Sequence, residues 1–401
     1  QSYIPLNQTD SRTLSNAYDL TDIITGATPS TSINEYWNGD IPWMSSGELN
    51  MKLVRSVYGR ITQKGYDSCG THMIPPLCVL IGLAGQGKTR GTAAINYISL
   101  CTNQSIASIL PSSYFDSFFL FYWLDNQYYN LRMLSAGDGG RGGLNKQLLL
   151  NLWVPLPLLK EQNAIANSLS SIDSLISSLD ELIEKKRMIK DGLMQELLTR
   201  KKRLKGFSGK CETVKLNEIA EMSSGGTPSS KEVSFYGGDI PFLSISDMTS
   251  SGKYIFRTEK TITKLGLENS SARVFPPGTL MYAMYASLGK CSITNIEVAI
   301  SQAILGFKLS PRVDKMFLYY HFCYIEESVK KIGQTGTQSN LSKQIVENFA
   351  LELPEIDEQK AIGRVLSDID LEISTIESMR DKYLLIKQGM MQQLLTGKTR
   401  L

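Results

Sequence analysis

A long heptad segment in the middle of the chain constrains the fold more than any other feature. Residues 158–205 carry apolar side chains at seven-residue spacing without an intervening proline. The first apolar row is Ile165, Ile172, Leu179 and Leu193, broken only by Lys186, and the second is Leu175, Leu182 and Ile189. This spacing is typical of a coiled-coil helix. Such a helix would extend on the order of 65 Å, too long to be enclosed by one compact domain, so we predict that it packs against a partner helix.

The partner helix is predicted at the C-terminus, because the central pattern recurs there. Residues 144–201 have related residues 197 positions later. The most similar stretch is GLMQELLTRK at 192–201, which returns as GMMQQLLTGK at 389–398. The matching seam positions in the second copy are Ile369, Ile376, Ile386 and Met390, with Tyr383 in place of Lys186. The chain is therefore a tandem duplication.

The duplication divides the chain into four parts. Its 401 residues exceed the usual size of a single domain, which agrees with two copies. We predict a globular unit at 1–157, a long helix with a linker at 158–205, a second globular unit at 206–353 and a second long helix at 354–401. Strands inside the globular units and the long helices after them predict an α+β fold class.

The charge of the chain is nearly balanced. With 42 basic and 39 acidic residues the formal charge is +3, which excludes a strongly polybasic tail protein but not clustered contacts to nucleic acid. Basic residues do gather at 184–210. A solvated helix end and a direct contact with phosphates are equally good explanations of that cluster.

The six cysteines show no Cys-x-x-Cys spacing, and only His72 and His321 accompany them. Neither a zinc site nor a disulfide framework is indicated, so we expect reduced thiols in a cytoplasmic protein. The longest apolar run, 118–124, is far shorter than the roughly 20 residues of a membrane span. No signal peptide is evident, and because the chain begins at Gln1 without a methionine we do not expect this to be its natural start.

Each globular unit contains a Gly-Asp-Ile-Pro turn signal, at 39–42 and at 238–241. Glycine and proline there predict a turn followed by a short strand. Small polar residues follow in both copies and are suited to hydrogen-bond base edges, although surface loops commonly carry the same residues. The candidates for DNA contact are Ser45, Ser46 and Glu48 in the first unit and Ser244, Ser246 and Asp247 in the second.

A formal phosphate-loop pattern spans Gly82 to Thr89, which raises the alternative of a nucleotide hydrolase. A phosphate loop must open a helix, whereas the residues that follow begin with Gly91 and favour a strand. We therefore predict a strand, an exposed turn and a second strand, whose tip contacts bases or phosphates. The tip candidates are Gln86, Lys88 and Arg90 in the first unit and Tyr285, Ser287 and Lys290 in the second.

Aromatic segments at 115–134 and 313–332 follow, and their helical apolar face predicts core packing. His321 stands where the first copy has Trp123, so we do not expect it to be catalytic. A glycine-rich loop then precedes the last strand of each unit and allows the backbone to approach a ligand, although it is equally a simple connector. The candidates for DNA contact there are Arg141, Lys146, Gln338, Ser339 and Lys343.

Taken in order and in duplicate, these elements resemble the specificity subunit of type I restriction and modification enzymes. The resemblance rests on the Thr-Pro and Gly-Asp-Ile-Pro turns, Leu-Ser-Lys-Gln at 341–344, a proline followed by Glu-Gln at each helix start, and Gly-Leu-Met-Gln-x-Leu-Leu-Thr at 192–199. It covers nearly the whole chain. It implies two target-recognition domains, each reading half of a bipartite DNA site, and two long helices packed as an antiparallel coiled coil with pseudo-twofold symmetry.

The resemblance also implies a non-catalytic chain without cofactor or metal of its own. Its partners would be double-stranded DNA, two modification subunits that carry S-adenosylmethionine and methylate adenine, and motor subunits that use ATP and Mg. No membrane partner is expected. The apolar positions proposed for partner contacts are Leu169, Ile176, Ile183, Leu366 and Ile373. A coiled-coil scaffold without base readout remains an alternative.

Overall fold

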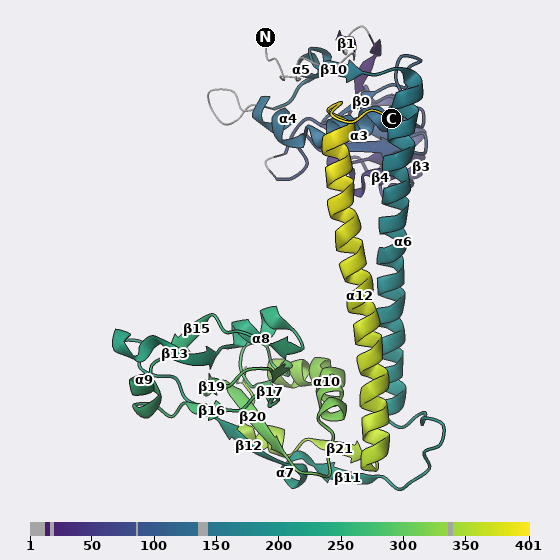
Figure 1. Ribbon diagram of the computed structural model, residues 1–401. Coiled ribbons are helices and arrows are strands. Elements are labelled where there is room, and N and C mark those ends of the chain that lie inside the picture. The colour runs from purple at the N-terminus through teal and green to yellow at the C-terminus, as the bar shows by residue number, and fades with distance from the viewer. Residues whose placement is uncertain (1–12, 17–19, 86, 135–142, 336–339) are drawn as a thin grey trace. The chain divides into compact units, whose positions relative to one another are not determined.

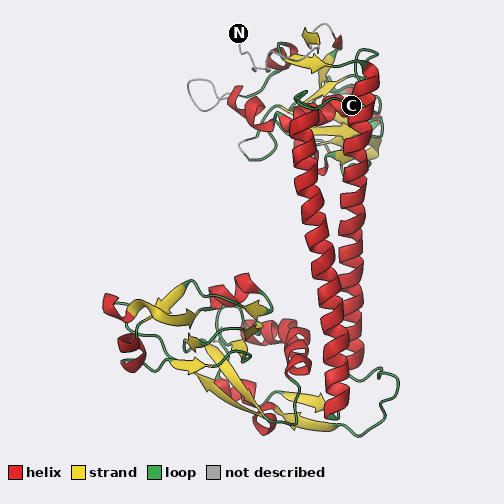
Figure 2. Ribbon diagram, viewed as in Figure 1, coloured by secondary structure: helices red, strands yellow, loops and turns green. Residues whose placement is uncertain are grey.

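A computed structural model describes residues 13–16, 20–85, 87–134, 143–335 and 340–401 (Figure 1). Its contacts divide the chain into two compact units. Unit 1 comprises Gln1–Asp180 and Ser378–Leu401, and unit 2 comprises Glu181–Glu377. Each unit combines β-sheets with short helices and with parts of the two long helices (Figure 2). Among the described helices, none is long and apolar enough to cross a membrane.

Unit 1 is built around a five-stranded sheet in the order β2–β9–β6–β7–β4. Its strands are β2 (Ile23–Thr25), β4 (Leu53–Val54), β6 (Val79–Gly82), β7 (Ala93–Asn96) and β9 (Ile106–Ile109). A smaller sheet has the order β5–β3–β8, from β3 (Trp37–Met44), β5 (Arg60–Ile61) and β8 (Cys101–Thr102). A strand pair joins β1 (Thr13–Asn16) to β10 (Trp153–Leu156).

Unit 2 repeats this plan. Its five-stranded sheet has the order β12–β20–β17–β18–β14, and the smaller sheet has the order β15–β13–β19–β16. The strands of the first are β12 (Ala220–Ser224), β14 (Tyr254–Ile255), β17 (Leu280–Ala283), β18 (Cys291–Thr294) and β20 (Ile304–Leu309). Those of the second are β13 (Tyr236–Leu243), β15 (Lys260–Ile262), β16 (Arg273–Phe275) and β19 (Val298–Ile300), and β11 (Glu212–Lys215) pairs with β21 (Ala350–Leu353).

Short helices connect and cover the sheets. In unit 1 they are α2 (Gln63–Asp67), α3 (Ser117–Asn126), α4 (Tyr128–Leu134) and α5 (Lys146–Leu150). In unit 2 they are α7 (Leu216–Ile219), α8 (Ile245–Ser251), α9 (Lys264–Glu268), α10 (Lys315–Thr335) and α11 (Lys343–Glu347). Most aromatic residues of α3 and α10 lie in the cores, which confirms the predicted packing for them, whereas Tyr129 on α4 and Tyr324 on α10 are exposed. His321 is also buried, and burial lowers its pKa to about 4, so it is neutral at pH 7.

The predicted Gly-Asp-Ile-Pro turn is wrong in both copies, because these residues lie inside strands β3 and β13. The strands are bulged rather than turned: Trp37 and Ile41 both pair with Ile61. The extra residues are accommodated by left-handed backbone at Asn38 (φ 62°) and Gly237 (φ 80°). Sequence signals for a turn and for a bulge are similar, since both need residues that tolerate positive φ.

The long helices are α6 (Leu159–Leu198) and α12 (Ile356–Leu394), and they pack antiparallel within each unit. In unit 1, Lys387 and Arg380 of α12 pair with Asp173 and Asp180 of α6, at N–O distances of 2.6 and 3.3 Å. In unit 2 the pairs are Lys190–Asp370 at 2.6 Å and Lys186–Glu372 at 2.5 Å. Residue numbers rise along one helix as they fall along the other, which confirms the antiparallel coiled coil.

The seam of this coiled coil differs from the predicted one. Ile165 and Leu179 of the predicted first row are buried, but the predicted second row is exposed, with 37% of Leu175, 39% of Leu182 and 42% of Ile189 accessible. Ile386 is also exposed. The apolar side chains that are buried are instead Leu169, Ile176 and Ile183 on α6, with Leu366 and Ile373 on α12. Of these, Leu169 lies in the core of unit 1 and Leu366 in the core of unit 2. The interpretation of these five as partner contacts is therefore wrong.

The predicted second row differs from the buried row because two neighbouring rows of a helix both fit the heptad spacing. Positions three and four residues after a heptad residue both lie beside it on a helix, so the pattern alone admits either row. The first heptad distinguishes them: Ser168 follows Ile165 by three residues and Leu169 by four. Since Leu169 is the apolar one of the two, the buried row runs through Leu169.

Candidate nucleic-acid interface

The segment that resembles a phosphate loop is a β-hairpin. Strands β6 and β7 are antiparallel, with Val79 opposite Ile95, and the Gly91 amide donates to the Gly82 carbonyl at 2.8 Å. A Cβ on Gly82 would lie 2.1 Å from the Thr89 carbonyl oxygen, so glycine is required for this close crossing. The strand after the turn confirms the predicted hairpin and contradicts the nucleotide-hydrolase alternative, which needs a helix there.

Helix α4 holds the turn of this hairpin in place. Arg132 donates to the Gly87 carbonyl at 2.7 Å, and the Tyr128 hydroxyl donates to the Lys88 carbonyl at 3.3 Å. The side chain of Lys88 is exposed and that of Arg90 is half-buried, while Gln86 lies outside the described residues. A backbone anchored in this way presents Lys88 from a fixed position.

The corresponding hairpin of unit 2 meets a helix with a polar face. In the β17–β18 turn, Lys290 donates its amide to the Ser287 carbonyl at 3.1 Å. The Ser287 hydroxyl lies 3.3 Å from that of Thr249 on α8. The structure thereby brings two predicted groups together, the hairpin tip with Tyr285, Ser287 and Lys290 and the α8 start with Ser244 and Ser246.

Glu48 and Asp247 have a structural role that the two repeats share. Glu48 accepts from the amide of Ser45 at 2.8 Å and Asp247 from that of Ser244 at 2.9 Å, so each acid caps the short helix that it opens. The second oxygen of Asp247 accepts the Glu259 amide at 2.8 Å, which fixes the following loop. Both carboxylates are thus engaged internally, while DNA contact by Ser45, Ser46, Ser244 and Ser246 stays a prediction.

A groove of about 900 Å³ lies next to α8 in unit 2. It is lined by Ser246, Ser250 and Ser251 from the helix and by Tyr254, Phe256 and Arg257 from the segment after it. Phe256 is 66% exposed, although an aromatic ring of this size is usually covered. Serine hydroxyls, a guanidinium and an exposed ring form a surface suited to hydrogen-bond and contact bases. Sequence reasoning missed this segment, whose Lys-Tyr-x-Phe-Arg alternation at 253–257 is the signal.

Lys253, at the inner side of this groove, is not available to DNA phosphates. Its ammonium group donates to the Tyr320 hydroxyl at 2.7 Å and pairs with Asp370 at 3.2 Å. Burial lowers the pKa of Lys253, while the carboxylate of Asp370 opposes that shift. Lys253 therefore links the wall of the groove to Tyr320 and Asp370.

The last predicted contacts lie at helix starts. Lys146 and Lys343 are exposed first residues of α5 and α11, whose preceding residues, Asn145 and Ser342, cap the helices. Lys343 pairs with Glu347 at 3.3 Å. A short helix therefore stands between each glycine-rich loop and the last strand. Outside the described residues lie Arg141, Gln338 and Ser339.

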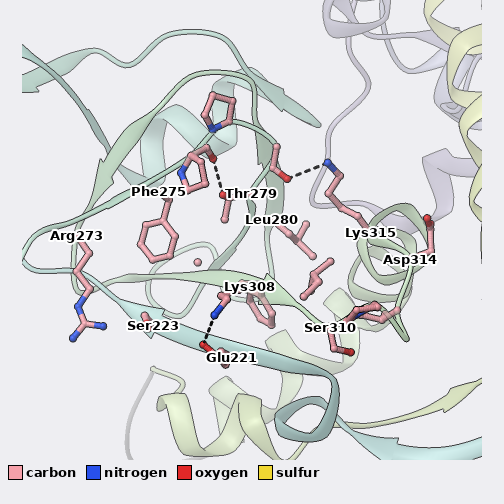
Figure 3. Close-up of a pocket in the computed structure, with 18 of the residues that line it drawn as sticks. Glu221, Ser223, Arg273, Phe275, Thr279, Leu280, Lys308, Ser310, Asp314 and Lys315 are labelled. Carbon is pink, nitrogen blue, oxygen red and sulfur yellow. Dashed lines mark hydrogen bonds and ion pairs between the residues drawn. The ribbon is translucent and has the colours of Figure 1, made fainter.

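A second hollow in unit 2, of about 800 Å³, is less suited to DNA (Figure 3). Its wall contains Phe275 and Leu280, and two of its lysines are engaged within the protein. Lys308 pairs with Glu221 at 3.1 Å, and Lys315 donates to the Gly278 carbonyl at 3.0 Å. Among the described residues no group of three His, Cys, Asp or Glu side chains is arranged to hold a metal ion.

Comparison with known proteins identifies relatives of both repeats. The family model for the type I restriction modification DNA specificity domain matches residues 14–186 and 209–384. The chain is 25% identical to the type I restriction enzyme MjaVIII specificity subunit of Methanocaldococcus jannaschii, over 95% of this chain and 91% of that protein. It is 24% identical to the EcoR124I/EcoR124II specificity subunit of Escherichia coli over 39% of each chain.

Solved structures show the same fold. The S subunit of a type I restriction-modification system from M. genitalium superposes with a TM-score of 0.62 at 17% identity, covering 98% of both chains. The HsdS subunit from Thermoanaerobacter tengcongensis superposes with a TM-score of 0.52 at 15% identity, covering 100% of both chains. The repeated sheets and long helices described above are thus those of a known fold.

Proposed function

This chain belongs to the type I restriction-modification DNA specificity family, a non-catalytic family that recognises DNA sequence, and from this premise we propose that each of its units reads one half of a bipartite target. The proposal rests on one observation: the two units contain equivalent β-hairpins whose turns carry different side chains. Equivalent hairpins present Lys88 and Arg90 in unit 1 but Tyr285, Ser287 and Lys290 in unit 2. Different side chains on turns that join equivalent strands are expected to read different bases.

Base contacts and phosphate contacts are expected from different residues. In the α8 groove of unit 2, Ser246, Ser250 and Arg257 would hydrogen-bond to base edges. The exposed ring of Phe256 would contact a base step that is deformed on binding. Exposed Lys146 and Lys343 would contact phosphates. Affinity would then fall steeply with salt, while the preference for one sequence over another would depend on the groove and the tips.

We further propose that two methyltransferase subunits dock on the long helices. Exposed apolar side chains occur at three equivalent positions of the duplication: Leu182, Met188 and Ile189 in unit 2, and Met379, Leu385 and Ile386 in unit 1. We call these two sets the α6 patch and the α12 patch. A duplicated apolar surface supports two copies of the same partner. S-adenosylmethionine would be held by these partners, and ATP with Mg by motor subunits.

Footprinting of the chain together with its methyltransferase partners tests the bipartite reading. The expected result is two short clusters of protected bases separated by unprotected ones, with different sequences in the two clusters. A single contiguous footprint would contradict two independent readers. A chain that protects no DNA, with or without partners, would instead favour the scaffold alternative.

A further inference from the structure

Two cysteines of unit 2 lie in contact without being bonded. Cys291 begins strand β18, Cys323 lies on α10, and their sulfur atoms are 3.8 Å apart. Cys291 is buried and its thiol donates to the Tyr319 carbonyl at 3.6 Å, whereas Cys323 is only partly buried. A disulfide requires the sulfurs to approach to about 2 Å, a small displacement from this arrangement.

The surroundings of Cys323 favour an anion. Its equivalent in unit 1 is Asp125, whose carboxylate lies 2.5 Å from the ammonium of Lys52. Lys253 precedes β14 as Lys52 precedes β4, so the thiol of Cys323 occupies the position of that carboxylate and interacts electrostatically with Lys253. The hydrogen bond with Cys291 lowers the pKa of Cys323 most, and a hydrogen bond with Tyr319 and the charge of Lys190 lower it further against the opposing effect of burial. Burial raises the pKa of Cys291. Cys323 is thus the better nucleophile and Cys291 the group that would resolve an adduct.

We propose that Cys291 and Cys323 form a modification site for low-molecular-weight disulfides, which convert the pair into an internal disulfide. The Cys323 thiolate attacks one sulfur of the external disulfide and expels the other as a thiolate. Cys291, on losing its proton, then attacks the Cys323 sulfur of this mixed disulfide and expels the second external thiolate. The two protein thiols are oxidised, the external disulfide is reduced to two thiols, and the two protons end on the released thiols.

The position of the pair connects this chemistry to the recognition surface. Cys291 directly follows the turn that carries Ser287 and Lys290. The same turn packs on α10, because a Cβ on Gly289 would lie 3.3 Å from Cγ of Glu326. An internal disulfide would fasten β18 to α10 at the base of the turn and change binding at one half-site only. Only this last effect rests on the proposed function. Unit 1 has Ala93 and Asp125 at the equivalent positions and cannot be modified in this way.

Mass spectrometry of the full chain tests the proposal. The folded protein is incubated with oxidised glutathione, free thiols are alkylated, and the digest is searched for linked peptides. The expected product links Cys291 to Cys323, while the other four cysteines are alkylated. A Cys291→Ser variant should retain glutathione on Cys323, and a Cys78→Ser variant, which removes another buried thiol, should still form the link.

Two results would overturn the proposal: alkylation of both Cys291 and Cys323 after oxidation, or a link from Cys323 to a different cysteine. The wild-type digest decides this even where a serine variant fails to fold. DNA footprints of oxidised and reduced protein are compared separately. If the linked peptides form but the footprint is unchanged at both half-sites, the proposed effect on recognition is wrong. If the reduced protein gives no footprint at all, that result counts against the proposed function alone.

Discussion

At the scale of single residues, the same buried junction occurs in both units. The Tyr122 hydroxyl donates to Asp173 at 2.7 Å, and the Tyr320 hydroxyl donates to Asp370 at 2.5 Å. Each aspartate also pairs with a lysine of the opposite long helix, and Asp370 takes Lys253 as a second cation. Because these charges are largely withdrawn from water, the removal of the aspartate leaves lysines without their partner.

An Asp370→Asn variant should therefore lose about 2 kcal/mol of stability at pH 7, measured by urea unfolding of the full chain followed by circular dichroism. Burial alone would raise the pKa of Asp370, but hydrogen bonds from Lys190 and Tyr320 with the nearby positive charges lower it below its usual 3.8. A lowered pKa contributes stability that is complete above pH 3.8 and is lost as the pH falls through the folded-state pKa. The difference between wild type and variant should shrink over that acidic range. Equal unfolding midpoints at pH 7 would contradict this role, and Asp368→Asn, at an exposed position, is the control.

Arg257 provides the residue-scale test of base reading. Among the described residues it has no hydrogen bond or ion pair, and its side chain lines the α8 groove. Arg257→Ala should cost about 1–3 kcal/mol of discrimination at one base pair, measured by competition between the target and single-base variants. Arg312→Ala, which removes an exposed arginine paired with Glu212, should leave discrimination unchanged. A uniform loss of affinity for all sequences would assign Arg257 to phosphate instead.

Several of these residue roles were visible in the sequence and others were not. Ser45-x-x-Glu48 and Ser244-x-x-Asp247 follow the capping-box pattern, so the internal role of both acids was available from spacing alone. The contact between Ser287 and Thr249 was not, because it depends on how a hairpin and a helix far apart in the chain pack together. DNA contact by the predicted residues remains a prediction.

At the scale of elements, the structure explains the Glu-Gln pair at the start of each long helix, which residue spacing alone did not explain. The Gln162 side chain accepts from the Asp116 amide at 2.9 Å, and Gln359 accepts from the Asp314 amide at 2.8 Å. Each long helix is thus joined to the short helix of its own globular domain. The preceding acid has a different role: Glu161 forms a paired hydrogen bond with Arg400, at 2.7 and 2.6 Å, beyond the end of the other helix. In unit 1 the Glu-Gln pair therefore connects the start of α6 both to the start of α3 and to the segment after α12.

The α6 and α12 patches make an element-scale prediction. Met188 is 67% exposed and its equivalent Leu385 is 69% exposed, so each is available to a partner. Met188→Ser or Leu385→Ser should weaken one of two methyltransferase sites by about 1.5–3 kcal/mol, and the double variant should weaken both. Titration calorimetry with the methyltransferase subunit measures the number of tight sites. Leu371→Ser, exposed but with Ser174 at the equivalent position, should retain both sites. Two tight sites in the double variant would exclude these patches.

Secondary structure was predictable where an apolar pattern extends over many residues. It was not predictable where the same short segment fits two local structures. The heptad spacing within 158–205 identified α6, and the β-branched residues after Gly91 identified the second strand of the hairpin. The second seam row and the Gly-Asp-Ile-Pro bulge were assigned wrongly, because neighbouring heptad rows, or turns and bulges, use the same residue types. Packing against a partner decides between them, and a single segment does not contain that information.

At the scale of the whole molecule, two units whose five-stranded sheets have the same strand order follow from the duplication of one sequence. Both α6 and α12 contribute residues to both units. If these helices separate the two readers, inserting one heptad into each should lengthen the unspecified gap of the DNA target while both half-site sequences stay the same. Footprints of the variant measure this directly. An unchanged gap would contradict the role of the helices as a spacer.

The central claim is that the two units read independently, and methylome sequencing after a domain exchange tests it most directly. A host would carry the methyltransferase partners with either the wild-type chain or a chain whose residues 206–353 come from another family member. We expect a two-part methylated motif in which one half changes and the other stays as in wild type. A contiguous motif, or a change in both halves, would contradict it.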